Sequence, residues 1–128
     1  MRLPGGDLEY AVWQSVCELG TASARDVLGQ VGETDGLAYT TIATVLGRLH
    51  AKGLLARKRK QMAFVYSPRI ARRVIELARV RESLQRLLRP ARRPAVATLV
   101  EAIESLDPGL LDELERVVAA RRRTRDGS

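Results

Sequence analysis

The first half of the chain places apolar residues at the spacing of α-helices. A first helix is predicted to begin at a cap on Asp7 and to end near Gly20, with an apolar stripe of Leu8, Val12, Val16 and Leu19. A second, short helix is predicted to start at Ser23–Asp26, because a serine followed three residues later by an acid forms a capping box, and to carry Val27, Leu28 and Val31. The glycine-containing segment 32–36 indicates a loop.

A third helix is predicted from Tyr39 or Thr40 to Gly53, since glycine commonly ends helices. Its two sides differ in chemistry. The buried side is expected to hold Ile42, Val45, Leu46 and Leu49. The opposite side is expected to hold Thr40, Thr41, Thr44 and Arg48.

Two strand-like segments follow at 54–60 and 63–68, with a turn around Lys60–Met62. The predicted elements follow the order of a winged helix-turn-helix, which has two helices, then a third helix, then a hairpin; here the hairpin is basic. In such a fold the third helix enters the major groove of DNA, and its apolar side is held by the first two helices. Threonine suits this position, because its hydroxyl can bond to bases or phosphates and its methyl can pack on thymine. The hairpin would lie along the phosphates as a wing.

The second half of the chain is predicted to be helical. A long helix has an apolar face of Ile70, Val74, Leu77, Ala78, Leu84, Leu87 and Leu88. The prolines of 89–95 interrupt it. A second helix carries Val96, Leu99, Val100, Ile103 and Leu106, and a third, after Asp107–Pro108, carries Leu111, Leu114, Val117 and Val118. We therefore expect a mainly α fold with a small β-hairpin wing, divided into a winged-helix domain at 1–68 and a helical domain at 69–128 with a basic tail.

The charge of the chain favours a polyanionic partner. The net charge is +7, and residues 48–60 carry six positive charges and no acid. Residues 69–93 carry nine arginines against two glutamates, whereas 95–120 carry six acids against one arginine. These arginines could pair with the acids of the last two helices or could contact DNA.

Other classes of protein fit the composition poorly. No apolar run reaches the roughly 18–20 residues of a membrane span, and the first residues lack the apolar block of a signal peptide, so a cytoplasmic protein is expected. One cysteine, Cys17, and one histidine, His50, cannot build a catalytic triad or a multi-cysteine metal site. We therefore expect neither an enzyme nor a metal or cofactor. Cys17 fits burial as a small hydrophobe better than redox sensing, and His50 is expected to be exposed at the end of its helix.

The segment 38–68 resembles the BlaI/MecI/CopY family of penicillinase-type repressors. The similarity lies in "AYTT", Thr44–Leu46, "RL" at 48–49 and "KGLL" at 52–55, then in Ala63, Phe64, Tyr66 and Pro68 of the hairpin. "DLEYAVW" at 7–13 and "ARDV" at 24–27 also resemble the first two helices of the family. The resemblance implies a homodimeric bacterial repressor on a palindromic operator, with a helical dimerisation region after the winged helix.

Two family features are missing from the chain. The copper-responsive branch carries C-terminal Cys-x-Cys motifs, and none occurs here. The penicillinase branch is cut by a membrane sensor protease between Asn and Phe, but the chain contains no asparagine and its one phenylalanine lies in the hairpin. A sensor protease is therefore a possible partner without a cleavage motif to support it.

The candidate site residues form two groups. Candidates for DNA contact are Arg25, Tyr39, Thr40, Thr41, Thr44, Arg48, Lys58, Arg59, Lys60 and Gln61. Candidates for dimerisation are Ile70, Val74, Leu77, Leu84, Leu87, Leu88, Leu99, Ile103, Leu111, Leu114 and Val118, because about 50 residues are few for an independent core and a second chain would cover their apolar stripes.

Each candidate group also has a plain structural interpretation. The threonines could simply form a solvated helix surface. The hairpin charges could serve to prevent an exposed edge strand from pairing with a strand of another chain. Two other functions stay open: an architectural protein that binds DNA without sequence preference, and a winged-helix module that binds proteins. The first would discriminate weakly between operator and random DNA. The second would need a more apolar third helix.

Overall fold

The computed structural model of the chain describes residues 1–32 and 37–127. Contacts divide the chain into two compact units, Met1–Arg81 and Glu82–Ser128. Their boundary lies inside helix α5 (Arg72–Leu88), whereas the division into functional domains after Pro68 stays a prediction. Apart from Gly32, the loop predicted at 32–36 lies outside the described residues.

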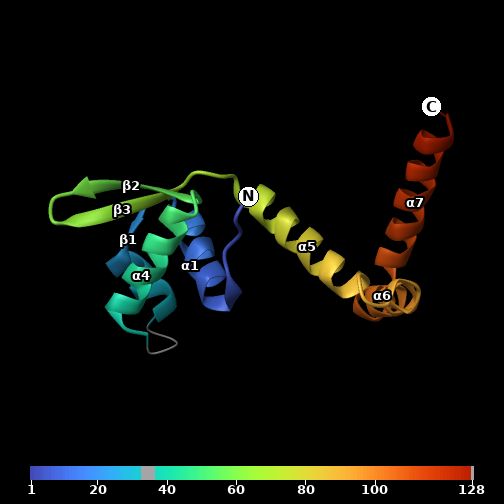
Figure 1. The fold of residues 1–128 in the computed structure, drawn as a ribbon, viewed down its shortest axis with the longest axis horizontal. Helices are drawn as coiled ribbons and strands as arrows, with labels where there is room; N and C mark the ends of the chain where they lie inside the picture. The colour runs from blue at the N-terminus through green and yellow to red at the C-terminus, as the bar shows by residue number, and fades with distance from the viewer. Residues whose placement is uncertain (33–36, 128) are drawn as a thin grey trace. The chain divides into compact units, whose positions relative to one another are not determined.

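The first unit has the winged-helix order predicted from the sequence (Figure 1). Its elements before α5 are α1 (Gly6–Leu19), β1 (Ala22–Ser23), α2 (Ala24–Val27), the π-helical turn η1 (Leu28–Gly32), α4 (Tyr39–Ala51), β2 (Leu55–Lys60) and β3 (Ala63–Pro68). The prediction of a mainly α fold with a small hairpin wing is confirmed.

A local sequence signal sets the start of α2. Ser23 and Asp26 form the predicted capping box: the Ser23 amide donates to Asp26 Oδ2 at 3.0 Å, and the Asp26 amide donates to Ser23 Oγ at 3.2 Å. The hydrogen bond from the Ser23 amide, helped by the Ser23 side chain, holds the pKa of the Asp26 carboxyl below its usual value. The predicted cap on Asp7 is wrong, because α1 starts at Gly6 after an N-cap at Gly5 and Asp7 falls within the first turn.

The sheet has three antiparallel strands in the order β1-β3-β2. The sequence predicted the β2–β3 hairpin but not β1, whose two residues pair Ala22 with Tyr66 and Ser23 with Val65. A strand of two residues is too short to show the alternation of polar and apolar residues by which strands are predicted. The turn between β2 and β3 contains Gln61 at φ 56, a left-handed conformation that a non-glycine residue seldom adopts.

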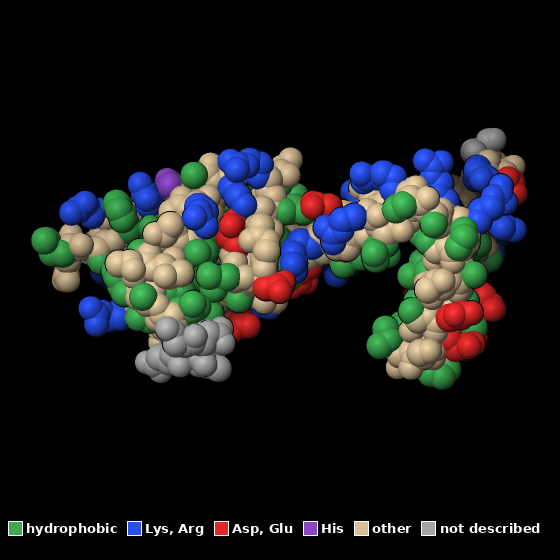
Figure 2. Space-filling model, turned by 60° about the horizontal axis from the view of Figure 1, so that its bottom comes forward, with side chains coloured by type: hydrophobic (Ala, Val, Ile, Leu, Met, Phe, Trp, Pro, Cys, Tyr) green, Lys and Arg blue, Asp and Glu red, His purple; other side chains and the backbone are tan. Residues whose placement is uncertain are grey.

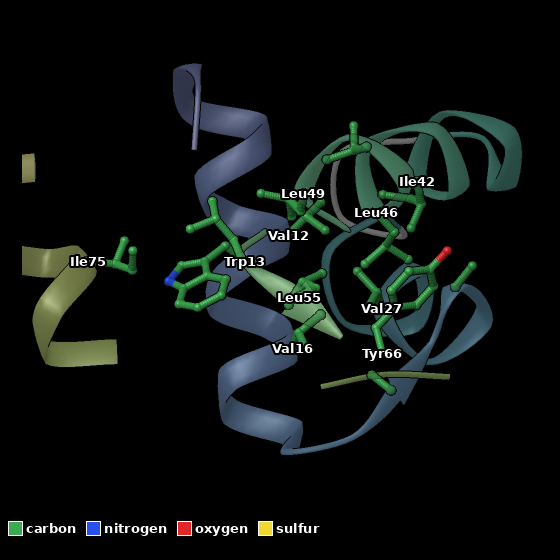
Figure 3. Close-up of a cluster of buried hydrophobic side chains, with 14 residues drawn as sticks. Val12, Trp13, Val16, Val27, Ile42, Leu46, Leu49, Leu55, Tyr66 and Ile75 are labelled. Atoms are coloured by element: carbon green, nitrogen blue, oxygen red, sulfur yellow. The ribbon is translucent and has the colours of Figure 1, made fainter. Parts of the chain in front are cut away.

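The core of the first unit lies between α1, α2 and α4 and the sheet (Figure 3). The four apolar residues predicted for the buried side of α4 are all buried, together with Leu55 and Tyr66 from the strands. Because Leu55 and Tyr66 share one face of the hairpin, the helices pack on that face of the sheet.

Helix α5 joins this core through Ile75, which is fully buried and faces Trp13 in Figure 3. The predicted apolar face of this helix left Ile75 out, and two of its members, Val74 and Leu77, are 47% and 53% exposed. Helix α5 also contacts α1 through a cation–π interaction: the guanidinium carbon of Arg79 lies 3.5 Å from the centre of the Tyr10 ring.

A largely buried ion pair connects the first helix to the end of α4. Lys52 bonds to the Glu9 carboxylate and donates to the backbone oxygen of Leu3 at 3.1 Å. Burial alone would raise the pKa of Glu9, but the hydrogen bond and charge of Lys52, helped by the Gly5 amide, hold that pKa below its usual value. His50 is half-buried rather than exposed as predicted, because its Nδ1–H donates to the Leu55 carbonyl at 3.0 Å.

The second unit contains the end of α5, then α6 (Arg92–Leu106) and α7 (Gly109–Gly127). The predicted interruption falls at residues 89–91, and Pro94 is accommodated in the first turn of α6. Helix α7 begins at Gly109, directly after the Asp107–Pro108 pair that was predicted as its cap and first helical residue, and Asp107 Oδ1 accepts from the Gly109 amide at 2.9 Å. Within the described part of this unit, neither α6 nor α7 has a buried residue.

Candidate nucleic-acid interface

Helix α4 has one side in the core and one side open to solvent. Ile42, Leu46 and Leu49 are fully buried and Val45 is 4% exposed. On the opposite side Thr40, Thr44 and Arg48 are exposed and Thr41 is half-buried, while Tyr39 at the helix start is 46% exposed. The structure therefore leaves all five predicted contact residues of α4 accessible to a partner.

The threonines border a shallow hollow of about 280 Å³. Thr40, Thr41, Thr44 and Arg48 line it together with Val45 and, from α1, Leu8. Leu8 was predicted only as part of the apolar stripe of α1, so its place beside the threonines is new. A polar helix surface with a small apolar floor can accept the edge of a base with its methyl group.

Thr44 uses its hydroxyl hydrogen inside the helix. Its Oγ1 donates to the Thr40 carbonyl at 2.8 Å, a common arrangement for threonine in helices. What Thr44 can offer a partner is therefore an oxygen lone pair, as an acceptor, and its methyl group.

At the start of α4 the Thr41 amide donates to the Ala38 carbonyl at 3.1 Å, while the Tyr39 and Thr40 amides have no hydrogen-bond partner among the described residues. Ala38 is the N-cap and contributes no side-chain hydrogen bond. The first amide groups of a helix have no partner within the helix and carry a partial positive charge. A phosphate is well bound in such a position, next to the hydroxyls of Thr40 and Thr41.

The wing presents different residues on its two faces. Residues opposite one another in an antiparallel pair lie on the same face. Arg57 pairs with Tyr66 and Arg59 with Phe64, which places these four on the face that continues into the core. Lys58 pairs with Val65 and Lys60 with Ala63 on the other face. Arg57, Lys58, Arg59 and Lys60 are all exposed.

The basic charges of the wing are not neutralised within the described residues. No carboxylate there forms a salt bridge with any of the residues 57–60. In the view of Figure 2, lysine and arginine side chains stand at the wing end of the first unit, and no acidic side chain appears there. The wing is therefore a surface of positive potential beside α4.

The remaining predicted contacts lie at the edges of this surface. Gln61 is exposed at the turn of the wing, next to Met62, which is 89% exposed. Arg25 is exposed on the short helix α2. Arg57 was not among the predicted contacts. Alternation of side chains along β2 would have placed it on the same face as Arg59, which was predicted.

A protein-family model described as "Penicillinase repressor" matches residues 5–120. The chain belongs to the penicillinase repressor family. It is therefore a DNA-binding transcriptional repressor and not an enzyme, and the resemblance found in the sequence is confirmed. The match includes the second unit almost to its end, where the motifs gave only a similarity of architecture.

Solved structures with a similar fold include other regulators. The DNA-binding domain of the repressor BlaI is 25% identical, with a TM-score of 0.48 over 56% of this chain and 88% of that one. The CopR repressor is 25% identical, with a TM-score of 0.45 over 56% of this chain and 100% of that one. The PcaV regulator from Streptomyces coelicolor is 22% identical, with a TM-score of 0.47 over 80% of this chain and 74% of that one. No curated protein matches the chain.

Other kinds of site are not found in the described part of the chain. It contains no group of three or more side chains suited to bind a metal ion, and no helix long and apolar enough to cross a membrane. Cys17 is half-buried against the core, and burial raises the pKa of its thiol. The thiolate, which is the reactive form, is therefore disfavoured.

Proposed function

We propose that this repressor binds a palindromic operator as a homodimer, with α4 of each chain in the major groove and the wing on the DNA backbone. The observation that carries the proposal is the two-sided helix α4, whose apolar side is completely buried while its threonines remain open. A helix of this kind is rigidly held and free to enter a groove about 12 Å wide.

The exposed residues then have separate roles. Thr40, Thr41 and Thr44 contact base edges or the phosphates beside them, and Tyr39 and Arg48 stand at the two ends of this row. Arg25 contacts a phosphate from α2. The wing provides contacts to the DNA backbone that do not depend on sequence; the residues predicted for this role are Lys58, Arg59, Lys60 and Gln61.

Dimerisation is supported by the apolar side chains of the second unit that this chain leaves uncovered. Leu87, Val96 and Leu106 are 66%, 55% and 81% exposed, and Val117 and Val118 are 47% and 40% exposed. So many exposed large hydrophobic side chains on one unit of a soluble regulator mark an interaction surface. A second copy of the chain would cover them with the same surface, as a two-fold axis requires.

An apolar groove gives the dimer a specific place for contact. It has a volume of about 420 Å³ and lies where the end of α5 meets α6, lined by Leu84, Leu87, Leu88, Ala91, Pro94, Ala95, Thr98, Leu99 and Ala102. Four predicted dimerisation residues line it: Leu84, Leu87, Leu88 and Leu99. Ile70, by contrast, packs against the core of the first unit.

Selection of duplexes from a random library tests sequence recognition and symmetry together. The expected product is a palindrome whose half-sites lie about one helical turn apart, roughly 34–36 Å. Selected duplexes without a common motif would support the architectural alternative instead. Because a repressor acts on the chromosome, we place this protein in the bacterial cytoplasm.

A further inference from the structure

The wing carries two arginines on one aromatic ring. The guanidinium carbon of Arg57 lies 4.2 Å from the centre of the Phe64 ring, and that of Arg59 lies 5.6 Å from it. Both distances fall within the range of about 6 Å in which a cation is attracted to the face of a ring. The β2–β3 register produces this cluster, because Arg59 lies opposite Phe64 and Arg57 is two residues away on the same face.

The Phe64 ring contacts a residue of the core, Tyr66. Phe64 meets Tyr66 edge to face, with centres 6.4 Å apart and an angle of 61° between the rings. Tyr66 is only 5% exposed, whereas Phe64 is 37% exposed. Phe64 therefore contacts a buried residue, while part of its surface stays exposed and the two guanidinium groups lie over its ring.

This cluster lies on the same face of the sheet as α4. Leu55 and Tyr66 continue the face of Arg57 and Arg59 into the core, against the buried side of α4. Lys58 and Lys60 alternate with the arginines and lie on the opposite face of the sheet. DNA bound by α4 would thus approach the wing from the arginine face.

Two positively charged guanidinium groups over one ring repel each other, so their arrangement needs a physical explanation. No carboxylate among the described residues makes a salt bridge with either arginine, so nothing in this part of the chain relieves their repulsion. An anion that accepts from both guanidinium groups would relieve it. Arginine matches the geometry of phosphate through paired hydrogen bonds, and lysine does not.

We propose that Arg57 and Arg59, held by Phe64, form the wing's phosphate-binding site for DNA, and that Lys58 and Lys60 contribute little. Phe64 is a positioning residue: it orders the two arginines before DNA arrives, so that less side-chain entropy is lost on binding. The inference rests on the proposed DNA-binding function and deepens it, because it assigns the contact to one face of the wing.

The first experiment compares charge removal on the two faces. Fluorescence anisotropy on the selected operator over a salt series measures full-length Arg57→Ala and Arg59→Ala, with Lys58→Ala and Lys60→Ala as matched controls. Each arginine variant should bind about tenfold more weakly, as expected for a lost charged hydrogen bond, and its salt slope should shrink by about one per chain. The lysine variants should stay within about threefold of the parent, in line with exposed, unpositioned charges. Equal losses on both faces would overturn the proposal.

The second experiment tests the ring without changing charge. Phe64→Leu should weaken binding about fivefold with an unchanged salt slope, and Phe64→Tyr should retain binding, because it keeps the ring. In a chain already carrying Arg57→Ala and Arg59→Ala, Phe64→Leu should have no further effect. A further loss in that background would show that Phe64 only supports the fold and would refute the positioning role. If the parent protein itself fails to bind any selected duplex, the proposed function fails rather than this assignment.

Discussion

Truncation of Ile75 to alanine should destabilise the first unit by about 3 kcal/mol. Ile75 is fully buried and is the residue of α5 that enters the core, where it faces Trp13 (Figure 3). The change removes three buried carbon groups at about 0.8 kcal/mol each, and the cavity left beside the indole adds to the cost. The buried indole Nε1 has no hydrogen-bond partner among the described residues, so packing alone holds the ring there.

Urea unfolding followed by the fluorescence of Trp13, the one tryptophan in the chain, measures this loss. Val80→Ala is the matched control, because Val80 lies on the same helix and is 55% exposed; it should change the free energy of unfolding by less than about 0.5 kcal/mol. Both variants are compared at one protein concentration, since dimerisation contributes to stability. A loss below about 1 kcal/mol for Ile75→Ala would show that α5 does not pack on the winged helix in solution.

Two further changes test the ion pair and the apolar groove. Lys52→Met should cost about 3 kcal/mol at pH 7, because it leaves the Glu9 carboxylate buried without its partner. Since the pKa of Glu9 in the folded protein lies below its usual value, its stabilising contribution is present above about pH 4.3 and is lost as the pH falls through the lowered pKa. Urea unfolding at pH 7 and pH 3.5 should therefore show a smaller cost at the lower pH; an equal cost at both would contradict the pairing. Leu99→Asp places a charge in the groove and should give the 14.2 kDa chain mass by light scattering, where the parent gives about twice that mass. A dimer that survives this change would exclude the groove from the interface.

Periodicity and capping chemistry predicted most of the fold because those signals are local. The capping box needed only a serine and an acid three residues apart, and the buried side of α4 needed only the helical spacing of its isoleucine, valine and leucines. The cap on Asp7 failed for an equally local reason, since the glycines before it allow the N-cap to lie two residues earlier, at Gly5.

Contacts between distant elements could not be read from these signals. Ile75 lies off the apolar face predicted for α5, and only the approach of α1 makes its position a core position. The ring contacts of Arg57 depend on which residue of β3 lies opposite each residue of β2, and that register is set by the turn at Gln61. The alternation of arginine and lysine along β2 was visible in the sequence, but the position of the Phe64 ring beside the two arginines was not.

The central claim is that α4 reads sequence, and replacing its threonines tests it most directly. Thr41→Ala and Thr44→Ala remove groups that face solvent, and alanine is the better helix former, so the helix should stay folded by circular dichroism. Thr124→Ala is a matched control, because Thr124 is exposed and also donates to a carbonyl four residues earlier, at 3.1 Å, far along the chain on α7. By fluorescence anisotropy each α4 variant should lose about 1–3 kcal/mol of binding free energy on the selected operator, little on a scrambled duplex, and the control should lose nothing on either. Equal losses on operator and scrambled DNA would contradict the account, because α4 would then hold DNA without reading it.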